Sequence, residues 1–439
     1  MISRELAIVL RARVTWIVAG LAALLVGHGF VLAVDLFTAG SRSVAGNVLM
    51  AREFDPLAGI VRPTLGGLYL AASLLGPIAA ARAIAVEKER RSFGALVLLS
   101  GSHERVVLAK YLAALAGGWI LLTGPLAAIA AWRAVGGQLA FRETVVALVG
   151  HGLYIALVTA VATAAAAWSR TVAQAATLAV VVVLASWAID ASEGFAALAW
   201  LGRLADWSVT THLTPFERGI LPLGAAAWML SLTAGCVALS LVGARFDVAR
   251  GRRTTLAMAV IAVTAGALVV SSRIHRAYDF TEAARASLPP AAVAGLRAIT
   301  APITLEVYLD RDDSRRRQME SDIIARLRLA LGDIRIEYPL DGREAPSEAT
   351  HDDGYGRIIV RVGGRHAETQ STSRREVTTL IFEAAGQPLP DWSQPAYPGY
   401  PLVVGRTARR ALGVCAYIVF PGALFAVGFL VTRSKRRTS

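Results

Sequence analysis

Charged residues are scarce in this chain. Only 18% of its 439 residues are Asp, Glu, Lys or Arg, whereas 55% are hydrophobic. Because soluble domains usually carry about 25% charged residues, we do not expect the whole chain to fold as a soluble globular protein. Its length accommodates a bundle of membrane helices together with one small soluble domain.

Cysteine is almost as scarce. The two cysteines, Cys236 and Cys415, lie far apart in the sequence, and each is surrounded by apolar residues. This spacing excludes a C-x-x-C redox motif and the Cys/His patterns of zinc sites. We expect both cysteines to be packing residues.

Enzyme motifs are missing as well. The sequence contains no G-x-x-x-x-G-K-[ST] phosphate loop, no H-E-x-x-H and no G-x-S-x-G. We therefore expect no catalytic residues, no ATP hydrolysis by this chain, and no cofactor or metal bound to it. Asp310, Asp312 and Asp313 suggest a cation site, but acidic residues also favour the N-terminal end of a helix dipole, which is the simpler interpretation.

Long apolar runs are what the chain has in abundance. A membrane helix needs about 20 predominantly apolar residues, because each residue adds 1.5 Å across a hydrocarbon core of about 30 Å. The run nearest the N-terminus, residues 14–34, is longer than the apolar region of a signal peptide, which is about 7–15 residues. We therefore expect it to be a retained helix. Eight runs qualify, at residues 14–34, 63–81, 111–132, 144–169, 171–189, 219–244, 254–272 and 411–431.

Basic residues predict how these helices are oriented. With the N-terminus inside, the inner segments contain 18 Lys and Arg residues and the short outer loops contain seven, and positive charge concentrates on the cytoplasmic side. Both termini are therefore predicted to be cytoplasmic in an inner membrane. Residues 273–410, with 20 Arg and 19 acidic residues, are predicted to lie outside. The scattered basic residues form no groove for nucleic acid.

The outer segment has the pattern of a small α/β domain. Residues 303–309, 333–338 and 357–362 are rich in β-branched residues or alternate in polarity, as strands do. Residues 313–331 have apolar side chains at helical spacing, and Ser373 with Glu376 predicts a capping box. The β-α-β-β-α order indicates a thioredoxin-like sheet, although without a cysteine pair it has no thiol chemistry.

The segment 87–110, EKERRSFGALVLLSGSHERVVLAK, is the most informative part of the chain. It is too polar to cross a bilayer and too apolar for a free loop, so we expect an amphipathic helix at the inner membrane surface. Such a helix anchors the chain to lipid or docks on a partner protein. For docking we single out the residues Glu87, Lys88, Glu89, Arg90, Arg91, Phe93, Leu98, Leu99 and Lys110.

This segment resembles the signature of ABC-2 type permeases, the membrane subunits of ABC exporters. In that family a Glu-basic-Glu run is followed by an apolar stretch and then by a lysine that opens the third helix. Glu87-Lys88-Glu89, Leu98-Leu99-Ser100 and Lys110-Tyr111-Leu112 occur in this order. Arg91-Ser92 and Gly101 depart from the Gly-Thr and Pro that are common there. The segment 212–219, HLTPFERG, resembles the outer part before the sixth helix.

The outer segment resembles a different protein, the auxiliary subunit of gliding-motility-type ABC exporters, in a shortened form. That subunit has a thioredoxin-like domain after one helix and ends in a helix and a basic tail. The two resemblances divide the chain into a six-helix permease (1–247), a seventh helix (248–272), an outer α/β domain (273–410), and a last helix with a basic tail (411–439). The fold class is thus mainly α, a membrane helix bundle with a small α/β domain.

The resemblances imply an ATP-dependent exporter. They imply a separate ATP-binding subunit, which binds the ATP, and a second permease half that is a copy of this chain or a related chain, all within membrane lipid. His28, His151 and Gln174 lie inside apolar runs, where polar groups are costly and mark possible substrate paths; hydrogen bonds between helices are the simpler interpretation. The alternative function is a non-transporting scaffold or envelope assembly factor whose outer domain binds a partner.

Overall fold

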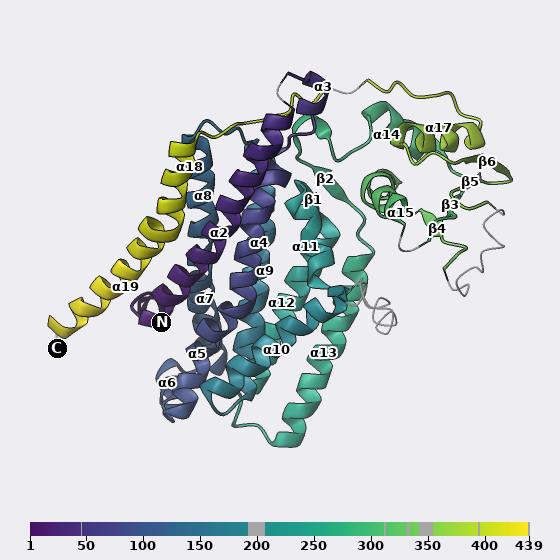
Figure 1. Cartoon of the computed structure of the whole chain (residues 1–439). Coiled ribbons are helices and arrows are strands. Elements are labelled where there is room, and N and C mark those ends of the chain that lie inside the picture. Colours follow the sequence, from purple (N-terminus) through teal and green to yellow (C-terminus); the bar gives the residue numbers. More distant parts are fainter. Residues whose placement is uncertain are drawn as a thin grey trace, which may run out of the picture. The chain divides into compact units, whose positions relative to one another are not determined.

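The computed structural model describes residues 1–44, 46–191, 207–310, 313–331, 334–341, 354–393 and 396–437. The chain is mainly helical and divides into two compact units. Unit 1 comprises Met1–Ile274 and Pro398–Ser439, and unit 2 comprises His275–Tyr397. Figure 1 shows both, coloured along the sequence.

Unit 1 is a helix bundle. Its first half contains α1 (Ile2–Leu10), α2 (Arg13–Ser43), α3 (Val48–Ala51), the π-helical turn η1 (Leu57–Val61), α4 (Arg62–Leu74), α5 (Gly76–Glu89), α6 (Phe93–Ser100), α7 (His103–Trp119), the 3-10 turn η2 (Ile120–Leu122), α8 (Thr123–Ala134) and α9 (Phe141–Trp168). Its second half contains α10 (Val172–Ala191), α11 (Val209–Glu217), β1 (Ile220–Pro222), α12 (Leu223–Gly243), α13 (Arg250–Ser272), α18 (Arg406–Val414), the π-helical turn η8 (Cys415–Val419) and α19 (Phe420–Arg437).

Eight helical stretches within the described residues are long and apolar enough to cross a membrane. Each overlaps one of the eight runs predicted from hydropathy, so the prediction of a membrane protein with eight candidate spans is confirmed. The observed stretches are Arg13–Ser43, Leu57–Glu89, His103–Ala134, Phe141–Trp168, Val172–Ile189, Leu223–Gly243, Arg250–Ser272 and Arg406–Val431.

Helix α9 lies at the centre of unit 1 and packs against α4, α5, α7, α10, α11 and α12. It is the most buried of the candidate spans, and half of the residues in its second half are alanine, which allows neighbouring helices to approach closely. Helices α2 and α4 also approach closely. A side chain at Gly67 would come within 2.6 Å of the carbonyl oxygen of Leu25, so glycine is required there.

The outward-facing surface of these helices is apolar. On α13, Met258, Val263 and Val270 are each more than 60% exposed. Large exposed apolar surfaces are uncommon on soluble monomers but are expected where lipid replaces water as the solvent. The C-terminal helix α19 packs along α2, beside which it runs in Figure 1.

Unit 2 contains a four-stranded sheet in the order β4-β3-β5-β6. Strand β3 pairs in parallel with β4 and antiparallel with β5, which pairs antiparallel with β6. Its elements are β2 (Ala277–Asp279), the 3-10 turn η5 (Glu282–Ala284), α14 (Pro290–Ala298), β3 (Ile303–Val307), α15 (Ser314–Met319), the π-helical turn η6 (Glu320–Ile324), α16 (Ala325–Leu331), β4 (Arg335–Glu337), β5 (Ile358–Val362), β6 (Arg365–Thr369) and α17 (Arg374–Ala385).

Unit 2 has a hydrophobic core of its own, in which Leu305 and Val360 of the sheet meet Ile323, Leu327 and Ile381 of the helices. The three predicted strands and both predicted helices are present. The capping box is half formed: Ser373 Oγ accepts a hydrogen bond from the Glu376 amide at 3.2 Å, but the Glu376 carboxylate accepts from Thr369 Oγ1 instead of from the Ser373 amide.

Candidate functional site

The charged run at the end of α5 begins with Glu87, which takes part in a buried ion triad. Lys110 of α7 donates from Nζ to Glu87 Oε1 and to Glu5 Oε2, each at 2.9 Å. The Lys110 side chain is only 2% exposed. Because removing one partner of a buried ion pair leaves an uncompensated charge, this triad fixes α1, α5 and α7 to one another.

Lys88 points to a different helix. Its Nζ donates to the carbonyl oxygens of Ala166, Ala167 and Ser169, at 3.1, 2.7 and 2.5 Å. The last carbonyl groups of a helix have no partner within it and carry the negative end of its dipole. Lys88 thus caps the C-terminal end of α9.

Glu89 and Gln174 stabilise the start of the next helix. Glu89 Oε1 accepts a hydrogen bond from the amide of Val172, the first residue of α10, at 2.7 Å. Gln174 Oε1 accepts from the amide of Arg170 at 3.2 Å, and the Gln174 amide donates to Thr171 Oγ1. The carboxylate complements the positive end of the α10 dipole. Two neighbouring residues of opposite charge therefore stabilise the turn between α9 and α10. Lys88 binds the C-terminal end of α9, and Glu89 binds the N-terminal end of α10.

The expectation of one amphipathic helix over residues 87–110 is wrong, because two turns divide the segment. After α5, Arg91 adopts a left-handed conformation with φ +56°, and after α6 Gly101 does so with φ +70°. Ser102 then caps α7, its Oγ accepting from the Arg105 amide at 3.4 Å. Glycine adopts the left-handed conformation without steric cost, so Gly101 is a natural end for α6.

The short helix α6 packs one side against the bundle and leaves another side exposed. Phe93 is 3% exposed and meets the ring of Phe246 edge-on, with 5.9 Å between centroids. Leu98 and Leu99 are 85% and 82% exposed. Arg90 is also exposed. The residues singled out for docking differ in exposure. Lys110 and Phe93 are buried, whereas the exposed ones are Glu89, Arg90, Arg91, Leu98 and Leu99.

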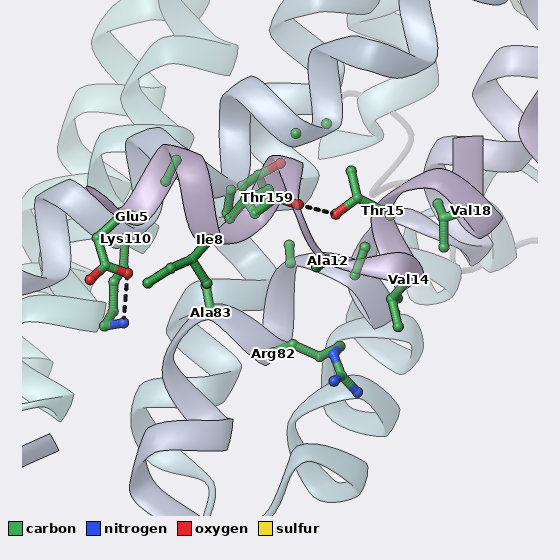
Figure 2. Close-up of a pocket in the computed structure, with 18 of the residues that line it drawn as sticks. Glu5, Ile8, Ala12, Val14, Thr15, Val18, Arg82, Ala83, Lys110 and Thr159 are labelled. Carbon is green, nitrogen blue, oxygen red and sulfur yellow. Dashed lines mark hydrogen bonds and ion pairs between the residues drawn. The ribbon is translucent and has the colours of Figure 1, made fainter. Parts of the chain in front are cut away.

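A cavity of about 530 Å³ lies beside the ion triad. Figure 2 shows Glu5 and Lys110 at one end of its lining, Val14 and Val18 at the other, and Arg82 between them. The walls come mainly from α1, α2, α5, α7 and α9, and most of them are alanine, valine and glycine. The charged residues of the lining are Glu5, Arg11, Arg82, Glu87, Arg90 and Lys110.

The three polar residues predicted to mark a substrate path lie apart from this cavity and from one another. His28 Nδ1 is 2.9 Å from the hydroxyl of Tyr417 in η8, His151 is fully buried in α9, and Gln174 stands at the start of α10. All three are described residues, and none of them lines the cavity. His28 thus makes a hydrogen bond between helices, the simpler of the two interpretations.

His151 belongs to a polar cluster that sequence reasoning missed. Its Nε2 is 3.5 Å from Oε1 of Glu217 at the end of α11, and Glu217 Oε2 accepts from Arg62 Nε at 3.2 Å. The carbonyl oxygen of Ala147 lies 3.1 Å from His151 Nδ1. Burial raises the pKa of the Glu217 carboxyl, and the charge of Arg62 partly opposes this. The sequence feature that could have indicated this cluster is Glu217, the acidic residue within the segment 212–219.

One of the acidic residues considered for a cation site, Asp313, caps a helix. Asp313 Oδ1 accepts from the Arg315 amide at 2.8 Å and caps α15. The Arg315 guanidinium lowers the pKa of the Asp313 carboxyl to about 2. Asp312 lies outside the described residues. Within the described part of the chain, no group of three His, Cys, Asp or Glu residues is arranged to hold a metal ion.

Comparison of this chain with known protein families, with curated proteins and with solved structures finds no match. The functional conclusion therefore depends on the residues and their geometry.

Proposed function

We propose that this chain is the membrane permease subunit of an ABC-type exporter, driven by ATP that a separate ATP-binding subunit hydrolyses. The observation that carries the proposal is the helix α6, which displays Leu98 and Leu99 almost fully exposed at one end of the bundle. Exposed leucines on a short helix suit docking into a groove of a partner protein.

The run Glu87–Lys88–Glu89 supports the proposal because it fixes the end of α5, the helix that comes before α6 in the chain. Its side chains bind α7 and α1, the C-terminal end of α9, and the N-terminal end of α10. A force applied to α6 therefore acts on several candidate spans together. An ATP-binding subunit that moves α6 would shift the bundle between inward and outward states, because it binds those states with different affinity.

This arrangement separates two groups among the residues that were singled out for docking. Arg90, Arg91, Leu98 and Leu99 form the proposed contact surface with the ATP-binding subunit. A second group of charged side chains supports that surface by binding neighbouring helices of the bundle, namely Glu87, Lys88, Glu89 and Lys110. The second permease half is a copy of this chain or a relative.

For unit 2 we propose a shortened thioredoxin-like auxiliary domain on the outer side of the membrane. The strand order β4-β3-β5-β6, with a parallel pair followed by two antiparallel pairs, supports this fold. The helices α15 and α16 between β3 and β4, and α17 after the β5–β6 hairpin, support it too. Both cysteines lie in unit 1, so the proposed role of the domain is binding rather than thiol exchange.

The test is co-purification of the tagged chain from mild detergent after crosslinking in membranes. We expect an ATP-binding-cassette subunit to accompany the wild type and to be lost from Leu98→Glu/Leu99→Glu. The matched control is Leu49→Glu/Met50→Glu, two exposed apolar residues on the short helix α3, at the opposite end of the bundle (Figure 1). Folding of each variant is checked by size-exclusion chromatography.

Two outcomes would contradict the proposal. If no ATPase accompanies folded wild-type protein, the exporter loses its source of energy, and the non-transporting scaffold becomes the better function. If both double variants lose the ATPase equally, α6 is not the docking element. Glu87→Ala is a poor test of docking, because it also breaks the buried triad.

A further inference from the structure

The cavity beside the ion triad has two kinds of lining. Its walls are apolar and small, from residues such as Val14, Val18, Ala83 and Val86, whereas three arginines, Arg11, Arg82 and Arg90, also line it. A volume of about 530 Å³ falls within the range of about 300–1,000 Å³ that is typical of small-ligand sites. An apolar hollow with a basic rim suits an amphiphilic anion.

The acidic residues of the lining do not neutralise these three arginines, which can therefore bind an anion. Glu5 and Glu87, its two acidic residues, both bind Lys110. Within the part of the chain that the structure describes, the guanidinium groups of Arg11, Arg82 and Arg90 form no ion pair, and all three side chains belong to exposed residues. The net charge of the six charged lining residues is therefore positive.

The arginines of the lining lie at or near the ends of candidate spans, where the headgroups of a bilayer meet its hydrocarbon core. Arg82 is within the apolar stretch Leu57–Glu89, about 10 Å along the helix from its charged end. Arg11 lies two residues before the first candidate span. The amphipathic helix α1 covers the cavity and is held to α2 by Thr15 Oγ1, which donates to the carbonyl oxygen of Val9 at 2.7 Å, as Figure 2 shows.

One further atom points to the chemistry of the occupant. Oε2 of Glu87 is shielded from solvent and accepts no hydrogen bond from the described residues. A buried oxygen without a donor is costly. A rotation of the Glu87 side chain would turn this oxygen toward the cavity, where a hydroxyl donor beside the phosphate of a headgroup would bind it while the arginines bind the phosphate.

We propose that this cavity binds one anionic phospholipid of the phosphatidylglycerol type, drawn from the surrounding leaflet. Arginine recognises phosphate through several parallel N–H donors, and basic pockets between membrane helices bind anionic headgroups. The headgroup and the first part of the acyl chains enter the cavity, and the remainder of the chains stays in the bilayer. The proposal concerns lipid alone and does not rest on the exporter function.

Native mass spectrometry of the full chain, released from nanodiscs that contain phosphatidylglycerol and phosphatidylcholine, tests this proposal. We expect one phosphatidylglycerol molecule to remain bound to the wild type. In Arg82→Gln/Arg90→Gln its affinity should fall roughly 25-fold, since each basic residue near an anionic headgroup contributes about fivefold. The matched control, Arg250→Gln/Arg252→Gln, removes the same charge from exposed positions at the start of α13.

A second variant separates the cavity from general surface charge. Ala83→Phe places a ring in the cavity without altering charge, and it should also lose the bound lipid while retaining the elution profile of the wild type. Equal loss from the α13 control pair would show binding to basic surface in general. Undiminished binding by both cavity variants, or equal retention of phosphatidylcholine, would likewise overturn the proposal.

Discussion

His151 Nε2 lies 3.5 Å from Glu217 Oε1. The pair joins the central helix α9 to the end of α11, and Arg62 of α4 approaches the same carboxylate. A histidine that looks isolated in an apolar run is therefore the buried member of a cluster of three titratable groups, in which the Arg62 side chain is 45% exposed.

The Glu217 cluster predicts a specific dependence of stability on pH. Because burial raises the pKa of the Glu217 carboxyl, the folded chain holds this proton more tightly than the unfolded chain. Its stabilising contribution is full below the usual glutamate pKa of about 4.3 and is lost as pH rises through the folded-state pKa. The advantage in melting temperature of Glu217→Gln over wild type should therefore grow as pH rises.

Glu53→Gln is the control for this measurement, since Glu53 is exposed and should give no such trend. Thermal unfolding in detergent between pH 4 and pH 8 provides the comparison. An advantage of Glu217→Gln that shrinks as pH rises would mean that the charged carboxylate stabilises the fold.

The buried triad predicts a large effect at Lys110. Lys110→Met leaves Glu5 and Glu87 facing each other without a cation, which should cost about 3–5 kcal/mol of unfolding free energy. Adding Glu5→Gln and Glu87→Gln to the same chain should restore much of that loss, because no buried charge remains. Thermal unfolding in detergent measures both variants. A triple variant no more stable than Lys110→Met would contradict the electrostatic explanation.

The cap of α15 predicts a smaller, local effect in unit 2. Asp313→Ala should lower the stability of α15 by about 1 kcal/mol, seen as faster hydrogen exchange of its amides in the full chain. Because the pKa of Asp313 is lowered to about 2, its contribution is present above the usual aspartate pKa of about 3.9 and is lost as pH falls toward 2. Unchanged exchange in α15 would show that another group caps this helix.

The orientation expected from the basic residues predicts which sites an impermeant reagent reaches. In a chain with Cys236 and Cys415 replaced by alanine, Gly364→Cys in unit 2 should react with a membrane-impermeant maleimide in intact cells. Gly251→Cys at the start of α13 should react only after lysis. A side chain at either glycine meets no atom within 4 Å, so both variants should fold. The reverse pattern would invert the topology.

Hydropathy was enough to find the candidate spans. All eight runs fall on helices because chain length and apolar composition, which are local properties, decide whether a segment can cross a bilayer. The strands β3 and β5 were found for a similar reason, since β-branched residues are concentrated in them. Strand β6 was missed, because its sequence RHAET is polar and lies at the edge of the sheet.

The segment 87–110 shows where local sequence patterns are insufficient to predict structure. Its charges and apolar residues were visible in sequence, but the left-handed turn at Arg91 and the partners of Glu87, Lys88 and Glu89 were not. Those partners come from α1, α7, α9 and α10, which are brought together only by packing. The same holds for Glu5, which in sequence is simply an acidic residue before the first span.

The sequence by itself determined that this is a membrane protein, where its candidate spans lie, and that a small α/β unit interrupts them, because composition and periodicity act over short distances. The tertiary structure decided which charges are buried and which are displayed. It placed Lys110 between two carboxylates, left Leu98 and Leu99 exposed, and formed a cavity whose lining includes three arginines. Those features depend on contacts between residues far apart in the chain, which no local pattern specifies.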